Sequence, residues 1–284
     1  MSDRPASPAV RIVTDSACDL PADVAAAWGI HIVPLTIRIG GVDHIDRTQL
    51  TTAQFWAMCA ASPELPTTAA PSPGQFEQAF RQVAAEGAEG IVVISLSGAL
   101  SATIQSAELA ADEVAGLLPV NVVDSRNCTL GQGMIALACA RLAAQGGTLT
   151  EVTALAERLV PRTHVWGALD TLDNLKKGGR IGGAKALLAS ALAIKPIIEV
   201  RDGRVEQGGK QRTRAKALAF LVETLQSYGP IENLAVLHAD CADVDAFVAL
   251  VRQHHSGDIV VGDIGPVVGS HAGRGTIGVA FQVR

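Results

Sequence analysis

The sequence Ile91-Val92-Val93-Ile94-Ser95-Leu96-Ser97-Gly98-Ala99-Leu100-Ser101-Ala102-Thr103 joins an apolar run to a turn rich in hydroxyl groups. The four β-branched residues at its start predict a buried strand, which the serines and the glycine end. A strand that ends in this way and then opens a helix presents hydroxyls and free backbone N–H groups at one point, which suits a carboxylate or a phosphate. The stretch holds no obvious activated nucleophile. It therefore predicts a site that holds an anion rather than one that attacks a substrate.

The same alternation of strand and helix runs through the first half of the chain. Strands are predicted at Val10–Thr14, Ile30–Ile39 and Val120–Asp124, in addition to Ile91–Ser95, and a helix at Pro21–Trp28. This βαβα order favours a parallel sheet flanked by helices.

Three capping-box patterns mark further helix starts, two in the first half of the chain and one at the beginning of the second. They are Thr51–Gln54, Ser72–Gln75 and Thr148–Glu151, each with a hydroxyl residue followed three positions later by Gln or Glu. In a capping box the two side chains satisfy backbone N–H groups at the start of the helix. We therefore expect helices after Thr51, from Pro73 to about Ala85, and from Thr148 to about Leu159.

The second half mixes hairpins with helices. A hairpin is predicted over Pro196–Arg214 around Asp202-Gly203. The other predicted elements are strands at His164–Leu169, Leu234–His238 and Ile259–Ile264, helices at Ala184–Ile194, Thr213–Tyr228 and Val244–His254, and a glycine-rich loop and strand over Gly265–Val283. We therefore predict an α/β protein in which an N-terminal parallel-sheet α/β domain (1–158) docks on a C-terminal α+β domain (159–284). A ligand is expected in the cleft between them.

Composition excludes several classes of function. The chain has 284 residues, of which 48% are hydrophobic and 18% charged, as in globular proteins. A net charge of −5 and an aromatic content of 4% argue against binding of nucleic acid. No apolar run has the length of a membrane span, and Met1–Val10 does not resemble a secretory signal. Five cysteines without a CxxC pair predict reduced thiols in a cytoplasmic protein with no structural metal and no cofactor.

Each candidate polar group has a structural alternative. Thr67 and Thr68 precede a capped helix, where Thr is often only a turn residue. Ser97, Ser101 and Thr103 lie where a strand gives way to a helix, and ordinary N-capping would explain at least one of them. The pairs Asp15-Ser16 and Asp124-Ser125 follow strands and could line a ligand crevice or cap helices.

Basic residues and one histidine complete the candidates. Lys176, Lys177 and Arg180 surround glycines and could hold a phosphate, and Lys210, Arg212 and Arg214 form a second cluster. Both clusters could equally be solvated surface. His271 lies among glycines that would let its imidazole approach an anion closely.

Several motifs together resemble the DegV family of fatty-acid-binding proteins over nearly the whole chain. They are Ile12-Val13-Thr14-Asp15-Ser16 with Asp19-Leu20-Pro21, Val33-Pro34-Leu35, the segment Pro66–Phe76, Leu100-Ser101-Ala102-Thr103 with Gln105-Ser106-Ala107, Val123-Asp124-Ser125, Leu175-Lys176-Lys177-Gly178-Gly179-Arg180-Ile181, Ile194-Lys195-Pro196-Ile197 and Gly265–Gly275. The resemblance implies a two-domain α/β protein with an acyl chain threaded between the domains.

The resemblance also implies roles for particular residues. In relatives that serve as the binding subunit of a bacterial fatty-acid kinase, a Thr, a Ser and a His hold the carboxylate, and these fall on Thr68, Ser101 and His271. Arginines that face the site and the kinase partner fall on Arg180 and Arg212. A separate kinase subunit would bind ATP and phosphorylate the presented carboxylate for phospholipid synthesis, so this chain would not itself be an enzyme.

The sequence departs from the family pattern at two places near these residues. The family usually has Thr-Ser-Gln-Pro where this chain has Thr68-Ala69-Ala70-Pro71, and Ser-Gly-Thr-Tyr where it has Ser101-Ala102-Thr103-Ile104. The three head-group residues are retained, whereas the pocket walls beside them differ. The length of acyl chain that fits is therefore left open.

Two other functions are compatible with the sequence. A stand-alone phosphoryl- or acyl-handling enzyme would use Lys177 and Arg180 to grip a phosphate and His271 as acid and base. A binding protein for a small ligand other than a lipid would use the same groups without turnover. The chain lacks GxSxG, HExxH and GxxxxGK[ST] motifs, which leaves the enzyme alternative without a recognisable catalytic signature.

Overall fold

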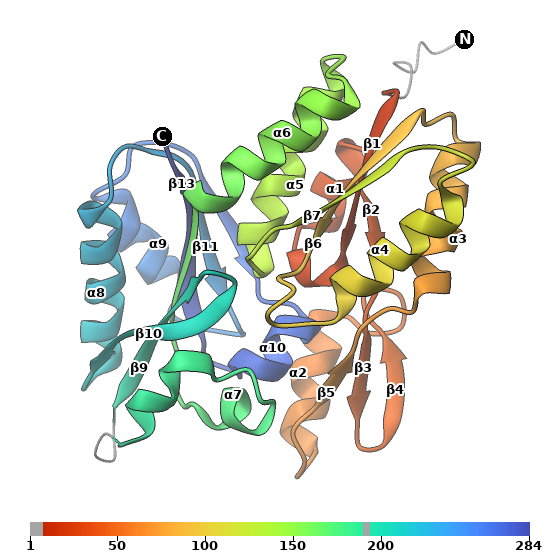
Figure 1. The fold of residues 1–284 in the computed structure, drawn as a ribbon. Coiled ribbons are helices and arrows are strands. Elements are labelled where there is room, and N and C mark those ends of the chain that lie inside the picture. Colours follow the sequence, from red (N-terminus) through yellow and green to blue (C-terminus); the bar gives the residue numbers. More distant parts are fainter. Residues whose placement is uncertain (1–7, 190–193) are drawn as a thin grey trace.

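The computed structural model describes residues 8–189 and 194–284. Figure 1 shows two sheet-containing regions side by side, with helices α5 (Thr129–Ala144) and α6 (Leu149–Leu159) running between them. We call them the N-terminal region, with β1–β7 and α1–α6, and the C-terminal region, with β8–β13 and α7–α10. Helix α5 contacts strands of both regions, so it forms part of the junction.

The N-terminal region is built on a four-stranded parallel sheet. Its order is β2 (His31–Val33), β1 (Val10–Asp15), β6 (Gly90–Ser95) and β7 (Val120–Asp124). Helices α5 and α6 pack on one face of this sheet, against β1, β6 and β7. Helices α3 (Pro73–Ala85) and α4 (Thr103–Val114) pack together on the other face (Figure 1). The predicted parallel sheet flanked by helices is confirmed.

The strand order creates a crevice at the carboxyl ends of β1 and β6. The chain moves from β1 to β2 on one side and later to β6 on the other, so the order reverses between β1 and β6. Ligands of open α/β sheets bind at such a reversal, beyond the carboxyl ends of the strands. Here these ends are Asp15 and Ser95.

The prediction of a single strand over Ile30–Ile39 is wrong. The segment divides at Pro34 into β2 of the parallel sheet and β3 (Thr36–Ile39) of a separate three-stranded sheet, in the order β4-β3-β5. Proline has no N–H to continue a ladder. Neither β4 (Val42–Ile45) nor β5 (Thr67–Ala69) was predicted. The turn from β3 to β4 uses Gly40-Gly41, both with positive φ, which glycine adopts without strain.

The C-terminal region is built on a six-stranded mixed sheet. Its order is β10 (Arg204–Gln211), β9 (Lys195–Arg201), β8 (Thr163–Ala168), β13 (Ile277–Val283), β11 (Ile231–His238) and β12 (Ile259–Asp263). All neighbours are antiparallel except β11 and β12. Helix α8 (Arg214–Ser227) packs against β8, β9 and β10 and contacts α9 (Val244–Arg252). The predicted α+β organisation and the β9–β10 hairpin are confirmed.

The short elements of the chain include both confirmed and corrected predictions. All three capping boxes form, at the starts of α2 (Thr52–Ala61), α3 and α6. The remaining short elements are α1 (Ala22–Ala27), α7 (Asp173–Lys177) and the 3₁₀ helices η1 (Ser16–Cys18) and η2 (Val160–Arg162). The predicted apolar helix Ala184–Ile194 is instead a 3₁₀ helix, η3 (Gly182–Ala189), and residues 190–193 of that prediction lie outside the described residues.

The glycine-rich loop predicted after Gly265 is also corrected, because it begins with a helix, α10 (Pro266–Ala272). Pro266 occupies the first helical position, where its missing N–H costs nothing. Gly269 lets the helix lie close to the rings of Phe55 and Trp56, since a Cβ at this position would come within 3.1 Å of them. His271 therefore lies on a helix rather than on a loop.

One large hydrophobic cluster joins the two regions. It contains Ile12 and Ile94 of the parallel sheet together with Val165, Val200 and Leu237 of the mixed sheet. The regions are thus closely docked, as predicted, while a domain division at 158/159 stays a prediction. Among the residues that the structure describes, no helix combines the length and the apolar character needed to span a bilayer.

Candidate functional site

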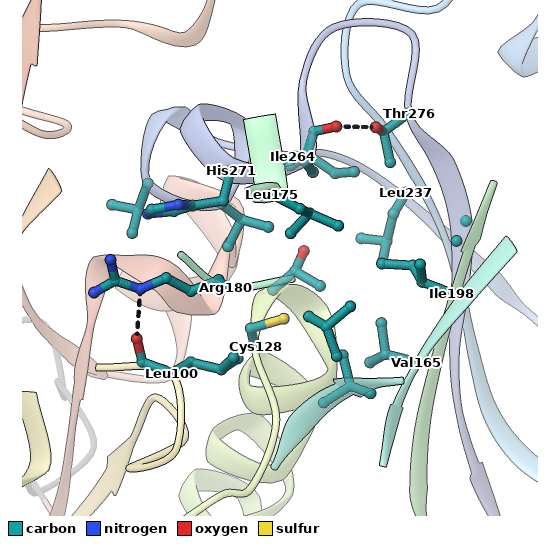
Figure 2. A pocket seen from close by; sticks show the side chains of 18 of the residues that line it. Leu100, Cys128, Val165, Leu175, Arg180, Ile198, Leu237, Ile264, His271 and Thr276 are labelled. Atoms are coloured by element: carbon teal, nitrogen blue, oxygen red, sulfur yellow. Dashed lines mark hydrogen bonds between the residues drawn. The ribbon is translucent and has the colours of Figure 1, made fainter. Parts of the chain in front are cut away.

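A pocket lies between the two regions, with a cavity volume of about 100 Å³. Apolar side chains from both regions form most of its wall (Figure 2): Leu35, Leu96, Leu100, Val165, Ile198, Val200, Leu237 and Ile264. Leu96 and Leu100 follow the carboxyl end of β6, so the crevice expected from the strand order forms the N-terminal wall of this pocket.

Four of the five predicted site residues line this pocket: Thr68, Ser101, Arg180 and His271. Thr68 lies on β5, and His271 lies in the last turn of α10. Their side chains meet, with Oγ1 of Thr68 2.9 Å from Nε2 of His271. The structure thus brings together hydroxyl and imidazole groups that are far apart in the sequence.

His271 is an uncharged hydrogen-bonding group. Burial, and next the positive charge of Arg180, lower the pKa of His271 to about 4, so the ring is neutral near pH 7. Its Nδ1 is buried without a hydrogen-bond partner among the described residues. The ring approaches the backbone so closely that a Cβ on Gly178 would lie 2.4 Å from Nδ1.

Arg180 connects the segment after α7 to the loop after β6. Its Nε donates to the carbonyl of Leu100 at 3.1 Å, as Figure 2 shows, and its Nη1 donates to the carbonyl of Gly178 at 2.7 Å. Leu100 immediately precedes Ser101. The guanidinium therefore lies beside Ser101 in the fold and supplies a positive charge near His271.

A second depression adjoins the pocket on its polar side. It is lined by residues that include Glu64, Thr67 and Lys177, and it shares Thr68, Arg180 and His271 with the pocket. These three shared side chains stand where the apolar pocket meets the outer depression. The predicted basic turn of Lys177 and Arg180 therefore faces a cavity rather than only bulk solvent.

Ser101 both lines the pocket and supports the start of α4. Its hydroxyl lies 2.8 Å from the hydroxyl of Thr103 and accepts a hydrogen bond from the Thr103 backbone N–H at 3.3 Å. The predicted N-capping role is thus present in part, although Ala102 is the N-cap residue. When Thr103 donates in the contact between the two hydroxyls, both lone pairs of the Ser101 oxygen are used and its proton remains available to a ligand.

The other polar residues that follow the strands hold the site loop in place. Asp15 accepts hydrogen bonds from the N–H groups of Ala17 and Leu96 at 3.0 and 2.7 Å. Asp124 accepts one from the N–H of Gly98 at 3.3 Å. Asp15 caps the 3₁₀ helix η1, which is the structural alternative, whereas Asp124 caps no helix and instead holds the loop after β6.

Ser97 has a role that the sequence did not indicate. It is fully buried, and its hydroxyl donates to the carbonyl of Gly203 at 2.7 Å. Gly203 lies at the tip of the β9–β10 hairpin, with a φ of 76°. Ser97 therefore links the loop after β6 to the hairpin of the C-terminal region.

Arg212, the fifth predicted site residue, lies elsewhere. It is exposed in the turn between β10 and α8, and it lines neither the pocket nor the outer depression. The neighbouring Arg214 is bound to both carboxylate oxygens of Asp243, at 2.9 and 3.0 Å. The basic cluster predicted around Arg212 is therefore not part of the pocket.

The start of α5 contributes pocket residues that sequence reasoning missed. Cys128 and Thr129 line the pocket, and Thr129 has a φ of 49°, an uncommon value for a β-branched residue. Burial raises the pKa of the Cys128 thiol to about 12, so it stays protonated and is a poor nucleophile. The sequence signal that could have indicated these residues was the predicted strand that ends at Asp124, because the segment after a parallel strand lies at the ligand crevice.

The sequence of this chain is similar to those of a known protein family over nearly its whole length. The sequence profile of the DegV family, described as uncharacterised proteins, matches residues 9–284. The chain belongs to the DegV family. A DegV domain-containing protein of Deinococcus radiodurans is 39% identical over 279 residues, covering 96% of this chain and 98% of the relative. One of Streptomyces coelicolor is 38% identical over 280 residues, covering 97% and 99%.

Solved DegV structures share the whole architecture. A DegV family protein from Thermus thermophilus, whose structure concerns fatty acid binding, superposes with a TM-score of 0.87 at 35% identity, covering 96% of this chain and 99% of that one. DegV of Bacillus subtilis, described as a fatty acid binding protein, has a TM-score of 0.86 at 25% identity, covering 98% and 100%. The fold expected of a DegV protein is thereby confirmed.

Proposed function

We propose that this protein binds a long-chain fatty acid in the pocket between its two regions and presents the carboxylate at the polar end. The observation that carries the proposal is the pocket itself, whose apolar wall ends at Thr68, Ser101, Arg180 and His271. The fatty acid binding described for the Thermus thermophilus and Bacillus subtilis proteins supports it. We also propose that the chain divides into domains at 158/159, so that the ligand lies between domains.

Most of the binding free energy would come from the acyl chain. Burial of apolar surface contributes roughly 0.8 kcal/mol per CH₂ group, so a dozen methylenes give on the order of 10 kcal/mol before the costs of association. A hydrogen bond to a charged group contributes only about 1.5–3 kcal/mol. The polar residues would thus orient the carboxylate and offset its desolvation, rather than supply most of the affinity.

The contact between Thr68 and His271 defines how the carboxylate would be held. If Nε2 of His271 carries the proton and donates to Oγ1 of Thr68, the Thr68 hydroxyl proton remains available to the ligand. The Ser101 hydroxyl supplies a second donor. Arg180 supplies the positive charge that the neutral imidazole lacks, and its Nη2 donates to no group among the described residues.

The presented carboxylate would be accessible to a partner. Because Thr68, Arg180 and His271 also line the outer depression, a head group held there faces outward beside Lys177. The proposed partner is a separate ATP-dependent fatty-acid kinase subunit, and the exposed Arg212 would contact that partner rather than the ligand. Arg212→Ala should then leave fatty acid affinity unchanged and lower the rate of acyl phosphate formation in the presence of the kinase.

An equilibrium titration tests the proposal. Delipidated protein should bind palmitate saturably with one site per chain, and Ser101→Ala should weaken that binding about tenfold, the loss of one hydrogen bond to a carboxylate. An unchanged affinity would remove Ser101 from the site, and no saturable binding by the unmodified protein would refute the function. Turnover of an acyl or phosphoryl substrate by the protein alone would favour the enzyme alternative.

A further inference from the structure

A row of four residues crosses the mixed sheet beneath the pocket. The backbone register pairs Leu237 of β11 with Gly278 of β13, Gly278 with Gly167 of β8, and Gly167 with Ile198 of β9. Directly paired residues of neighbouring strands point to the same face of a sheet. All four line the pocket, so this row forms part of its floor.

The two central positions of the row have no side chain. Leu237 and Ile198 therefore flank a depression that is two strands wide, at Gly167 and Gly278. Glycine inside a strand weakens the strand, because it loses more conformational freedom on folding and contributes no packing. Each of these glycines therefore calls for a structural or a functional reason.

Gly278 has a structural reason and Gly167 does not. A Cβ on Gly278 would lie 2.3 Å from the backbone oxygen of Trp166, which leaves no room for a side chain. A Cβ on Gly167 would meet nothing closer than 3.7 Å, the distance to Cδ1 of Leu169, with Ile198 next at 3.8 Å. These are ordinary contact distances, and the φ of Gly167 is not in the left-handed region. The protein itself would accept alanine at position 167.

The row lies across the pocket from the polar end. Figure 2 shows Arg180 and His271 on one side of the pocket and Ile198 and Leu237 on the opposite side. Gly167 lies between Ile198 and Gly278 in the register. A chain whose head group is held at Arg180 and His271 would therefore reach this row with its far end.

We infer that Gly167 is a specificity-determining residue that sets the longest acyl chain the pocket accepts. This inference rests on the proposed fatty acid binding. The space that a side chain at position 167 would fill is occupied by the last carbons of the ligand. A side chain there excludes those carbons and leaves the head-group contacts and the first part of the chain unchanged.

Competition binding with myristate, palmitate and stearate tests this inference. In Gly167→Ala and Gly167→Val, affinity for stearate should fall relative to myristate, by about fourfold for each terminal carbon excluded. Ile198→Ala removes a side chain from the same row and should shift the preference toward stearate. Because this variant deletes atoms, it tests the inference even if the substitutions at Gly167 do not fold.

Two further variants separate chain-length selection from general damage. Gly116→Ala adds a Cβ that has nothing within 4 Å, and it should leave the ratio of the affinities unchanged. Gly278→Ala should lower stability and weaken the binding of all three acids to the same extent, because its Cβ would collide with the backbone of Trp166. The inference is wrong if Gly167→Ala and Gly167→Val weaken the binding of all three acids equally. It is also wrong if neither these variants nor Ile198→Ala change the ratio of the affinities for stearate and myristate. Failure of the unmodified protein to bind any of the acids would instead contradict the proposed function.

Discussion

Oγ1 of Thr68 lies 2.9 Å from Nε2 of His271 across 203 residues of sequence. This contact joins β5 of the small antiparallel sheet to α10 of the C-terminal region. Thr68→Val keeps the shape of the side chain and removes its hydroxyl. We expect the variant to bind palmitate about 10- to 100-fold more weakly, as estimated for one hydrogen bond to a charged group. Equilibrium titration measures this change.

The adjacent residue provides a matched control. Thr67 lies on the same strand and is exposed, and it lines the outer depression but not the pocket. Thr67→Val should therefore leave palmitate affinity within about twofold of the unmodified protein, since the substitution is the same in kind and removes no ligand contact. Equal losses in the two variants would show that the hydroxyl at Thr68 has no specific role.

The close approach of Gly178 to His271 gives a second prediction. A Cβ at this position would lie 2.4 Å from Nδ1 of the imidazole, so Gly178→Ala must displace the ring or the end of α7. The expected result is loss of palmitate binding similar to that of Thr68→Val, with the far-ultraviolet circular dichroism spectrum unchanged. Full retention of affinity would mean that the position of the ring is not important for binding.

Buried Asp19 predicts a particular dependence of stability on pH. Burial raises the pKa of Asp19 to about 7 from its ordinary value of 3.8. Between these values the folded chain holds a proton that the unfolded chain has lost, so this group's contribution to stability falls as pH rises through that window. Asp19→Asn cannot titrate. The variant should therefore be more stable relative to the unmodified protein, with a larger free energy of unfolding, at about pH 8 than at about pH 5.

Urea denaturation at the two pH values measures this difference. His271 acts in the opposite direction, because its pKa is lowered to about 4 and protons bind preferentially to the unfolded chain below 6.5. Both proteins contain that histidine, so its contribution cancels in the comparison. The same relative stability at both pH values would show that Asp19 is ionised in the folded protein throughout.

The link between Ser97 and Gly203 should contribute more to stability than the neighbouring ion pair. The Ser97 hydrogen bond is buried, and its removal leaves a buried carbonyl without a partner, which costs about 1–3 kcal/mol. The Arg126–Asp202 pair is exposed, and such pairs contribute about 0–1 kcal/mol. Chemical denaturation of Ser97→Ala and Arg126→Ala compares the two. A larger loss in Arg126→Ala would contradict this assignment.

The sequence predicted the elements that depend on local signals. The three capping boxes formed because each needs only residues one turn apart, and the β9–β10 hairpin formed around Asp202-Gly203. The division at Pro34 and the pairing of β5 with β3 depend on partners distant in the chain. The helix at Pro266–Ala272 was hidden by Gly269 within it and by the glycines that flank it, although Gly269 serves packing against Phe55 and Trp56 rather than a turn.

The site was predictable in part, and mainly through family resemblance. Spacing alone left the hydroxyls of Thr68 and Ser101 undecided between structural and ligand-binding roles, and the structure shows that Ser101 has a structural contact as well as a place in the pocket. No local pattern indicates that Thr68 and His271 meet. The row through Gly167 was equally inaccessible, because strand register decides it.

Native mass spectrometry of the protein as purified tests the central claim most directly. We expect a bound mass that corresponds to one long-chain fatty acid per chain, lost on delipidation and restored by added palmitate. A protein that carries no lipid and gains none when palmitate is added would contradict the account, as would a bound species that is not a fatty acid.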